Sequence, residues 1–185
     1  MAIEIEKKYR LDKKRHDQLV SKLVEAGAKF TKEVFEENYL HRGGLLDERG
    51  AVLRLRKIGD YTILTYKEKL KNDDDIKHKI EYETVVADVD AMENIIGRLG
   101  YRLSVIYEKR RKIWRFKDVE VMMDELPFGL YMEIEGTAEG ISKSEKLLGI
   151  QDLETETRGY PRLTVKYGTI KGEVAESRFE RTVTA

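Results

Sequence analysis

Charged and apolar residues alternate in several short stretches of this chain, which is the periodicity of β-strands. In the first stretch, Glu4, Glu6 and Lys8 alternate with Ile5 and Tyr9. Because neighbouring side chains of a strand point to opposite faces, the charged groups share one face and the apolar groups share the other. The apolar face then packs outward while the charged face lines a separate space, which inverts the usual sheet.

The same alternation recurs along the chain, with both signs of charge on one face. A single pair of this kind is typical of a solvated strand, but the repetition predicts a barrel or strongly curved sheet with a charged interior. The later charged positions are Arg54, Arg56, Lys67, Lys79, Glu81, Glu83, Lys109, Arg111, Asp124, Glu133 and Glu135.

An interior lined by acids and bases indicates a charged ligand. Bases without a guest repel one another, and buried carboxylates without a partner take up protons. An anion held by Arg and Lys, together with a cation held by Glu, satisfies both requirements, and a polyphosphate with a divalent metal is such a combination. The chain has no Cys and 3 His, so we expect oxygen ligands, and hence Mg²⁺ or Mn²⁺, instead of zinc.

Other segments supply the expected helices and connections. Phe35 to His41 reads as a further strand, and the polar stretch Lys71 to Asp75 reads as a mobile connection at the mouth of the barrel. Asp and Ser residues before apolar stripes, and Gly residues after them, mark helix ends. The expected helices run from Asp12 to Gly27, from Asp88 to Gly100, from the capping box at Ser142 to Gly149, and from Glu154 to Tyr160.

Length and composition restrict the partners. We expect the 185 residues to form one domain over 1–170, followed by a C-terminal tail, 171–185, that frays. Lys plus Arg and Asp plus Glu both number 35, so no overall basic field predicts binding to nucleic acid or a membrane. The first residues lack the apolar run of a signal peptide, and no Cys is available for disulfides, so we expect a cytoplasmic location.

The charged motifs also resemble those of a known family. Glu4-x-Glu6-x-Lys8 resembles the ExExK signature of the CYTH superfamily, the triphosphate tunnel metalloenzymes, and the later charged pairs follow in the family's order up to Glu135. Tyr160 stands where the closing helix of the family usually carries a Tyr. The stretch from Leu99 to Arg111 is most similar to the class IV adenylyl cyclase branch.

The resemblance implies an α+β fold in which an eight-stranded antiparallel β-barrel forms a triphosphate tunnel with flanking helices. It also implies roles for individual residues. Glu81 and Glu83 would orient the bases or hold a second metal, and Glu4, Glu6 and Lys8 would form the catalytic group. The implied metal ligands are Glu4, Glu6, Asp124, Glu133 and Glu135, and the implied phosphate ligands are Lys8, Arg54, Arg56, Lys67, Lys109 and Arg111.

Lys8 has two alternative roles in such a tunnel. As a charged ammonium it binds phosphate, whereas a neutral Lys8 could deprotonate a water or a ribose 3′ hydroxyl. The neighbouring Glu4 and Glu6 favour the charged form, so phosphate binding is the first assignment.

Three functions are consistent with these residues. The first is a divalent-metal-dependent hydrolase acting on tripolyphosphate, thiamine triphosphate or another triphosphate, and the second is a class IV adenylyl cyclase that converts ATP to cyclic AMP and pyrophosphate. A non-catalytic polyphosphate-binding module is the third, and the many carboxylates count against it because they weaken anion binding unless metals occupy them. Members of the family can be homodimers, and the sequence does not decide between the substrates.

Overall fold

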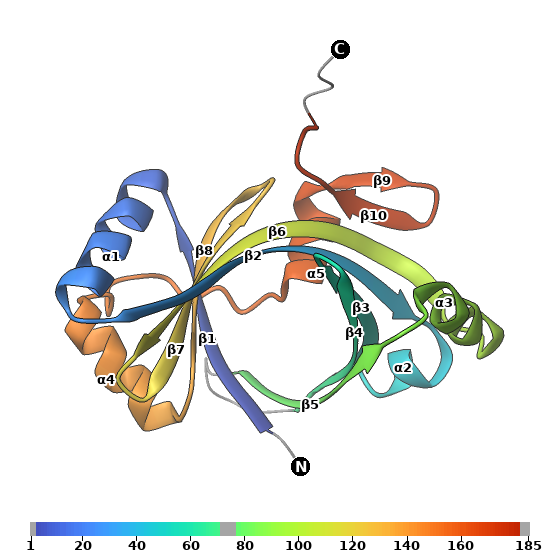
Figure 1. Ribbon diagram of the computed structural model, residues 1–185, viewed down its shortest axis with the longest axis horizontal. Helices are drawn as coiled ribbons and strands as arrows, with labels where there is room; N and C mark the ends of the chain where they lie inside the picture. The colour runs from blue at the N-terminus through green and yellow to red at the C-terminus, as the bar shows by residue number, and fades with distance from the viewer. Residues whose placement is uncertain (1–2, 71–76, 182–185) are drawn as a thin grey trace.

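Eight strands of the chain close into an antiparallel barrel, as the alternating pattern predicts. In the computed structural model, which describes residues 3–70 and 77–181, the order around the barrel is β2-β3-β4-β5-β1-β8-β7-β6, and β6 pairs again with β2. The strands encircle the centre of Figure 1. The predicted connection Lys71 to Asp75 lies outside the described residues. The barrel strands are β1 (Ile3–Leu11), β2 (Lys29–Arg42), β3 (Ala51–Ile58), β4 (Tyr61–Lys69), β5 (Lys77–Val86), β6 (Arg102–Phe116), β7 (Val119–Leu126) and β8 (Gly129–Glu135).

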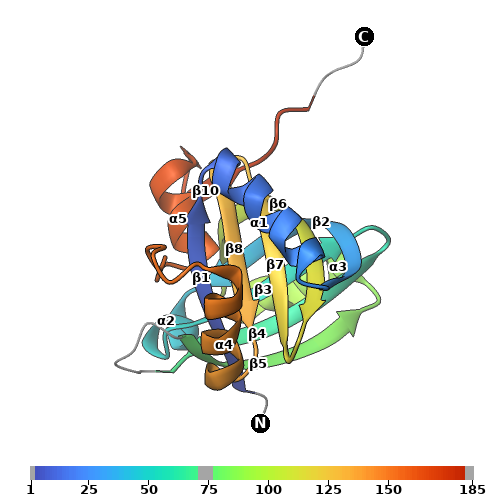
Figure 2. The same ribbon diagram turned by 90° about the vertical axis from the view of Figure 1, so that its left-hand side faces the viewer.

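Helices cover the outer, apolar face of the barrel. Figure 2 shows α1 (Lys13–Glu25) and α4 (Ala138–Leu148) lying across β1, β7 and β8. Leu19 and Leu23 of α1 and Ile141 of α4 are buried against outward residues of these strands, such as Val121 and Ile134. The main apolar core therefore lies between the barrel wall and the helices, and the inverted arrangement inferred from the sequence is confirmed.

A second apolar cluster lies on the opposite side of the barrel. Ile96 of α3 (Val89–Arg98) packs with Leu55 and Val86 on the outside of β3 and β5. A short helix, α2 (Gly44–Glu48), precedes β3. No helix in the described ranges is long and apolar enough to cross a membrane.

Helix ends follow the capping rules where the cap is local. Asp12 accepts a hydrogen bond from the Arg15 N–H at 2.7 Å, and Asp88 accepts one from the Ala91 N–H at 2.9 Å, as predicted. The predicted start of α4 at Ser142 is wrong: Thr137 caps this helix, because its hydroxyl accepts from the Gly140 N–H at 3.0 Å. A Thr cap five residues upstream therefore outcompetes the capping box.

The final helix also differs from the prediction over Glu154 to Tyr160. It is α5 (Tyr160–Tyr167), which begins where the predicted helix ends, with Gly159 as N-cap and Pro161 in the first turn. Proline is favoured there because its missing N–H would be unpaired in any case and its φ angle already suits a helix.

Part of the expected tail forms strands. Beyond α5 come β9 (Thr169–Lys171) and β10 (Val174–Ser177), and β10 pairs in parallel with Val105 to Tyr107 of β6. This stretch of β6 lies beyond its ladder with β7, which covers Arg110 to Phe116, so β10 takes an edge that β7 leaves free. Residues 174–177, in the segment predicted to be a frayed tail, thus form a strand.

Gly168 allows α5 and β10 to approach each other. A Cβ atom at this position would lie 2.4 Å from the Glu176 carbonyl oxygen and 2.7 Å from that of Thr164. Both obstructing atoms belong to the backbone, so only a shift of β10 or of the helix end would relieve the clash.

We therefore predict that Gly168→Ala lowers the free energy of unfolding by about 1–3 kcal/mol, as overpacking usually does. Gly97→Ala in α3 is the matched control, because a Cβ there meets nothing within 4 Å. Since alanine is the better helix former, the control should leave stability unchanged or raise it by up to about 1 kcal/mol. Urea unfolding of both variants measures the change in the free energy of unfolding. Equal changes in the two variants would contradict the close approach of Gly168 to the Thr164 and Glu176 carbonyl groups.

Candidate functional site: the charged barrel lumen

The barrel register brings the predicted site residues together on its inner face. Lys8 lies opposite Glu133, Lys67 opposite Glu81, and Arg111 opposite Asp124 on neighbouring strands. We call this inner face the charged lumen. It contains Glu4, Glu6, Lys8, Arg54, Arg56, Lys67, Glu81, Glu83, Lys109, Arg111, Asp124, Glu133 and Glu135, together with three residues described below.

One group of ion pairs in the lumen is formed by β1, β4 and β5. The Lys67 ammonium lies 2.6 Å from carboxylate oxygens of both Glu4 and Glu81. Lys79 lies 2.6 Å from Glu6. Each lysine thus contacts one of the acids that the resemblance implies as metal ligands, Lys67 contacting Glu4 and Lys79 contacting Glu6.

A second group joins β6, β7 and β8. Arg111 makes a bidentate contact with Asp124, at 2.7 Å from Nε and 2.6 Å from Nη2, and also contacts Glu133. Lys109 lies 3.2 Å from Glu36 and 3.7 Å from Asp124. These are deeply buried charges: Asp124 is 0% exposed and Lys109 3%.

Arg54 and Arg56 complete the basic lining on β3. The Nη2 atom of Arg54 lies 3.3 Å from Glu81 and 3.5 Å from Glu83, and the Nη2 atom of Arg56 lies 3.3 Å from Glu83. The Nε atoms of both arginines are buried, and neither has a hydrogen-bond acceptor within residues 3–70 and 77–181. Buried donors without acceptors are costly, so these two N–H groups would accommodate an anion.

One end of the lumen is closed by α5. Tyr160 and Leu163 pack with inward residues of the barrel, including Leu40 and Tyr131. The Tyr160 hydroxyl donates to Asp124 at 2.6 Å, so the Tyr expected from the resemblance is part of the site.

Lys8 lies at this closed end in surroundings that suit an ammonium. Its Nζ is 3.1 Å from Glu133, 3.3 Å from the Arg158 carbonyl oxygen and 3.6 Å from the centre of the Tyr160 ring. A carboxylate, a carbonyl and an aromatic face all stabilise positive charge.

Burial and pairing shift the ionisation of these groups in opposite directions. Burial alone would raise the pKa of Glu133, but Lys8 and Arg111 outweigh it and lower that pKa well below its usual range. Burial opposes charge on Lys67, yet Glu4 and Glu6 raise its pKa. Burial, followed by the neighbouring Arg111, lowers the pKa of Lys109.

Glu135 is the carboxylate with the least compensation. Burial, then the charges of Glu4 and Glu6, raise the pKa of Glu135 to about 7. Its carboxylate has no ion-pair partner in the described part of the chain. A cation near these three acids would relieve their mutual repulsion, and their oxygen donors are the type that Mg²⁺ and Mn²⁺ prefer. The donor chemistry therefore fits a divalent metal.

The acids are nevertheless not gathered into a metal-binding group as they stand. Across residues 3–70 and 77–181, no three carboxylate or imidazole groups are close enough to hold a metal ion. Two of the implied ligands, Glu4 and Glu6, are instead paired with the ammonium groups of Lys67 and Lys79.

Three lumen residues lack a role in the sequence analysis. Glu36 (2% exposed) and Asn38 (0%) lie within the predicted Phe35 to His41 strand, and Lys79 belongs to the alternating pattern. The i, i+2 spacing of Glu36 and Asn38 is the same signal that marks the other pairs, but only one of the two residues is charged.

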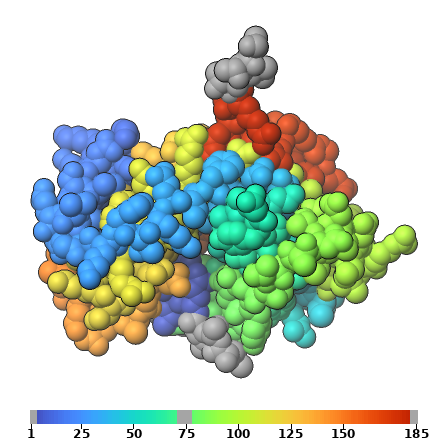
Figure 3. Space-filling view, in the orientation of Figure 1, coloured from blue at the N-terminus to red at the C-terminus, as the bar shows by residue number. Residues whose placement is uncertain are grey.

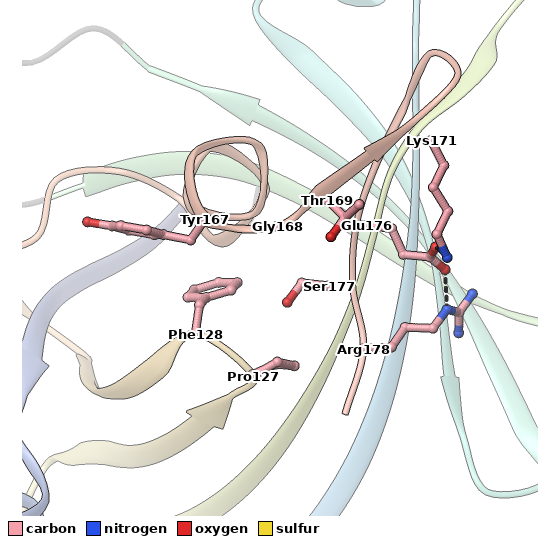
Figure 4. Close-up of a pocket in the computed structure, with 9 residues that line it drawn as sticks. All are labelled: Pro127, Phe128, Tyr167, Gly168, Thr169, Lys171, Glu176, Ser177 and Arg178. Carbon is pink, nitrogen blue, oxygen red and sulfur yellow. Dashed lines mark hydrogen bonds and ion pairs between the residues drawn. The ribbon is translucent and has the colours of Figure 1, made fainter. Parts of the chain in front are cut away.

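Two cavities lie outside the lumen. One, of about 290 Å³, lies between the end of α5, the β9–β10 hairpin and the turn before β8, and Figure 4 shows Phe128 and Tyr167 at one side of it. The other, of about 450 Å³, lies beside α1 and the β6–β7 hairpin. Neither contains a predicted site residue.

The fold is a closed antiparallel barrel, and its lumen is lined with paired acids and bases. Residues 2–161 match the CYTH domain model, so this chain belongs to the CYTH family. This family binds triphosphate substrates; its members are mostly enzymes, including triphosphatases, and are generally dependent on divalent metals.

Individual relatives agree with this membership. A Methanocaldococcus jannaschii protein named "Putative adenylate cyclase" is 31% identical over 149 residues, which cover 79% of this chain and 83% of the relative. The solved structure of the PH1819 protein from Pyrococcus horikoshii OT3 has a TM-score of 0.73 and 26% identity, covering 88% of this chain and 98% of that one. A Hippeastrum candidate adenylyl cyclase, described as having a dominant triphosphatase activity, shares the fold with a TM-score of 0.67 at 18% identity, covering 89% and 94%.

The raised pKa of Glu135 predicts a pH dependence of stability. Its folded pKa of about 7 exceeds the ordinary value of 4.5, so the folded protein binds more protons than the unfolded chain between these values. The resulting stabilisation is fully present below pH 4.5 and is lost as the pH rises through 7. The contribution of Glu135 to the free energy of unfolding, measured with urea in EDTA, should fall by roughly 1–3 kcal/mol between pH 5 and 7.5, since one pKa unit corresponds to about 1.4 kcal/mol.

Glu135→Gln should abolish most of this fall, whereas Glu154→Gln, at an exposed position, should keep it. The carboxylates with lowered pKa values, such as Glu36 and Glu81, titrate below this window. Burial lowers the pKa of His41 from 6.5, so His41 makes stability rise with pH in this range, but it does so in all three proteins, and the difference between the wild type and Glu135→Gln reports Glu135. An unchanged pH profile in Glu135→Gln would contradict the assignment.

Proposed function

We propose that this protein is a divalent-metal-dependent enzyme that binds a triphosphate in the charged lumen and hydrolyses one of its phosphoanhydride bonds. The observation that carries the proposal is the convergence of Arg54, Arg56, Lys109 and Arg111 with buried carboxylates in one lumen. Membership of a family that binds triphosphates supports the same conclusion.

The basic residues would hold the phosphates. Arg54 and Arg56 have buried Nε donors without acceptors, and a phosphate oxygen is the acceptor that a guanidinium fork suits best. Lys67, Lys109 and Arg111 would exchange a carboxylate partner for a phosphate oxygen. Because these bases are desolvated before the ligand arrives, they would favour the charge that develops on the transferred group.

The carboxylates would hold one or two metal ions. Glu4, Glu6 and Glu135 repel one another in the lumen, which the pKa of Glu135 reflects, and Asp124 and Glu133 complete the set carried over from the family. When bound, a divalent cation neutralises phosphate charge and favours attack by water. Glu81 and Glu83 orient the arginines through the ion pairs described above.

Lys8 belongs to the phosphate-binding set in this proposal. Its Nζ shares the Glu133 carboxylate with Arg111, another of the proposed phosphate ligands. A pH–rate limb that moved on Lys8→Arg would argue for the alternative role as a base.

Adenylyl cyclase activity is the second candidate. The relative from M. jannaschii, named a cyclase and 31% identical to this chain, favours it. Cyclisation differs in its nucleophile, a ribose hydroxyl instead of water, and would additionally require a site for the adenine base.

A direct assay separates these functions. Purified protein with Mg²⁺ or Mn²⁺ is incubated with tripolyphosphate, thiamine triphosphate or ATP, and orthophosphate, pyrophosphate and cyclic AMP are resolved. The proposal predicts metal-dependent orthophosphate release that EDTA and Glu4→Gln abolish. Formation of cyclic AMP and pyrophosphate from ATP would establish the cyclase. Tight binding of a triphosphate without turnover would support the non-catalytic polyphosphate-binding module.

A pair of neighbouring variants tests the location of the site. Arg56 faces the lumen, whereas Lys57, the next residue, faces outward and lies 4.9 Å from the Tyr39 ring. Arg56→Gln should lower kcat/KM about 100-fold, as expected when one donor to a developing negative charge is lost. Lys57→Gln should leave it unchanged, and equal losses in the two variants would place the chemistry elsewhere.

A further inference from the structure

The C-terminal segment of the described chain packs against the outside of the barrel wall. We call residues 174–181 the C-terminal strap. It consists of β10, which extends the edge of β6, and four residues that follow it. In Figures 1 and 3 it is the red segment beside β2 and β6. The strap lies beyond residues 2–161, the part that matches the CYTH model.

Arg178 connects the C-terminal strap to the barrel through ion pairs. Its guanidinium contacts Glu176 within the strap, which Figure 4 shows, and lies 3.3 Å from Glu37 on β2 and 3.2 Å from Glu108 on β6. The next residue, Phe179, donates its backbone N–H to Glu108 at 2.8 Å.

The aromatic ring of Phe179 reinforces this attachment. It lies 6.2 Å from the Phe35 ring, centre to centre, and the Arg110 guanidinium lies 4.3 Å from its centre. Arg181 also reaches Glu37 and Glu108, at 3.7 and 3.6 Å, but its side chain is 75% exposed, and exposed ion pairs contribute little.

Glu37 and Glu108 lie close enough to repel each other, and Arg178 reduces this repulsion. Glu37 and Glu108 are direct partners in the β2–β6 register, and like charges in opposed positions repel each other. Glu108 is 1% exposed, so solvent cannot screen the repulsion. Arg178 lies within ion-pair distance of both carboxylates and so offsets part of their repulsion.

The position of these acids connects the strap to the lumen. Glu36 and Lys109, the chain neighbours of Glu37 and Glu108, are also direct partners in the same register, and they face inward and form the 3.2 Å ion pair. Two adjacent pairs of the ladder are therefore bound by ion pairs: Arg178 contacts Glu37 and Glu108 outside the barrel, and Lys109 contacts Glu36 inside it.

We infer that Arg178 is a positioning residue for the triphosphate site, acting through the β2–β6 ladder to hold Lys109 and Glu36 in place. This inference rests on the proposed function, because Lys109 is one of the proposed phosphate ligands. Loss of Arg178 leaves two opposed carboxylates, one of them buried, without their main cation. We expect the local ladder to separate or admit water, and either change would displace Lys109.

Binding of tripolyphosphate with Mg²⁺, measured by calorimetry, tests the inference. Arg178→Gln should weaken binding roughly three- to thirtyfold, the range found for substitutions that act through an intervening network. Arg102→Gln is the matched control, because Arg102 also links β6 to the C-terminal hairpin, but through an exposed pair with Glu173 at 3.7 Å. The control should bind like the wild type.

A second variant distinguishes positioning from a general loss of stability. Glu108→Gln combined with Arg178→Gln removes both the cation and the buried charge that requires it, so binding should recover to within about threefold of the wild type. Thermal unfolding of each variant is recorded in parallel. Wild-type affinity in Arg178→Gln, or a loss in the double variant as large as in the single one, would overturn the inference.

The outcome for the wild-type protein keeps the two proposals apart. A wild type that binds no triphosphate overturns the proposed function itself. A wild type that binds tripolyphosphate, together with an Arg178→Gln variant that binds equally well, overturns only the role of the strap.

Discussion

The structure depends on pairing most of the charges that the barrel places in its interior. Moving an ion from water into a protein interior costs several kcal/mol even after relaxation, and attraction to a partner offsets that cost only when the geometry is good. The bidentate contact between Arg111 and Asp124 has this geometry, and Lys67 between Glu4 and Glu81 satisfies two acids with one base. Buried ion pairs of this kind stabilise a fold less than apolar packing would. Because stability does not explain their concentration in one lumen, we infer that the lumen binds a charged ligand.

The same constraint explains the outside of the molecule. Because the inner face is charged, the apolar residues of each strand point outward and would lie in water without cover. Helices α1 and α4 cover one side and α3 the other, and α5 closes one end with Tyr160 hydrogen-bonded to Asp124. Under the proposed function, a triphosphate and its metal replace the internal partners, the phosphates taking the bases and the cation taking the acids. The same lumen side chains would therefore stabilise the empty barrel and bind the triphosphate and its metal.

Much of the barrel could be predicted because its signal is local. The alternation Glu4, Glu6, Lys8 and its repeats correctly identify the inner face, and the Asp12 and Asp88 caps involve only the next few residues. What could not be predicted depends on distant contacts. Four residues of β10 form a strand only because β6 offers a free edge some 70 positions earlier in the chain. Glu36 is assigned to the lumen by its partner Lys109, and the start of α4 is set by competition between Thr137 and Ser142 as caps.

The most direct test is a crystal structure of the protein with tripolyphosphate and Mn²⁺, with anomalous scattering used to locate the metal. We predict phosphates inside the lumen, in contact with Arg54, Arg56, Lys109 and Arg111, and manganese bound by carboxylates that include Glu4 and Glu6. We also predict that Lys67 has moved away from at least one of its two acids. Tripolyphosphate bound outside the barrel, with the internal ion pairs unchanged, would contradict it.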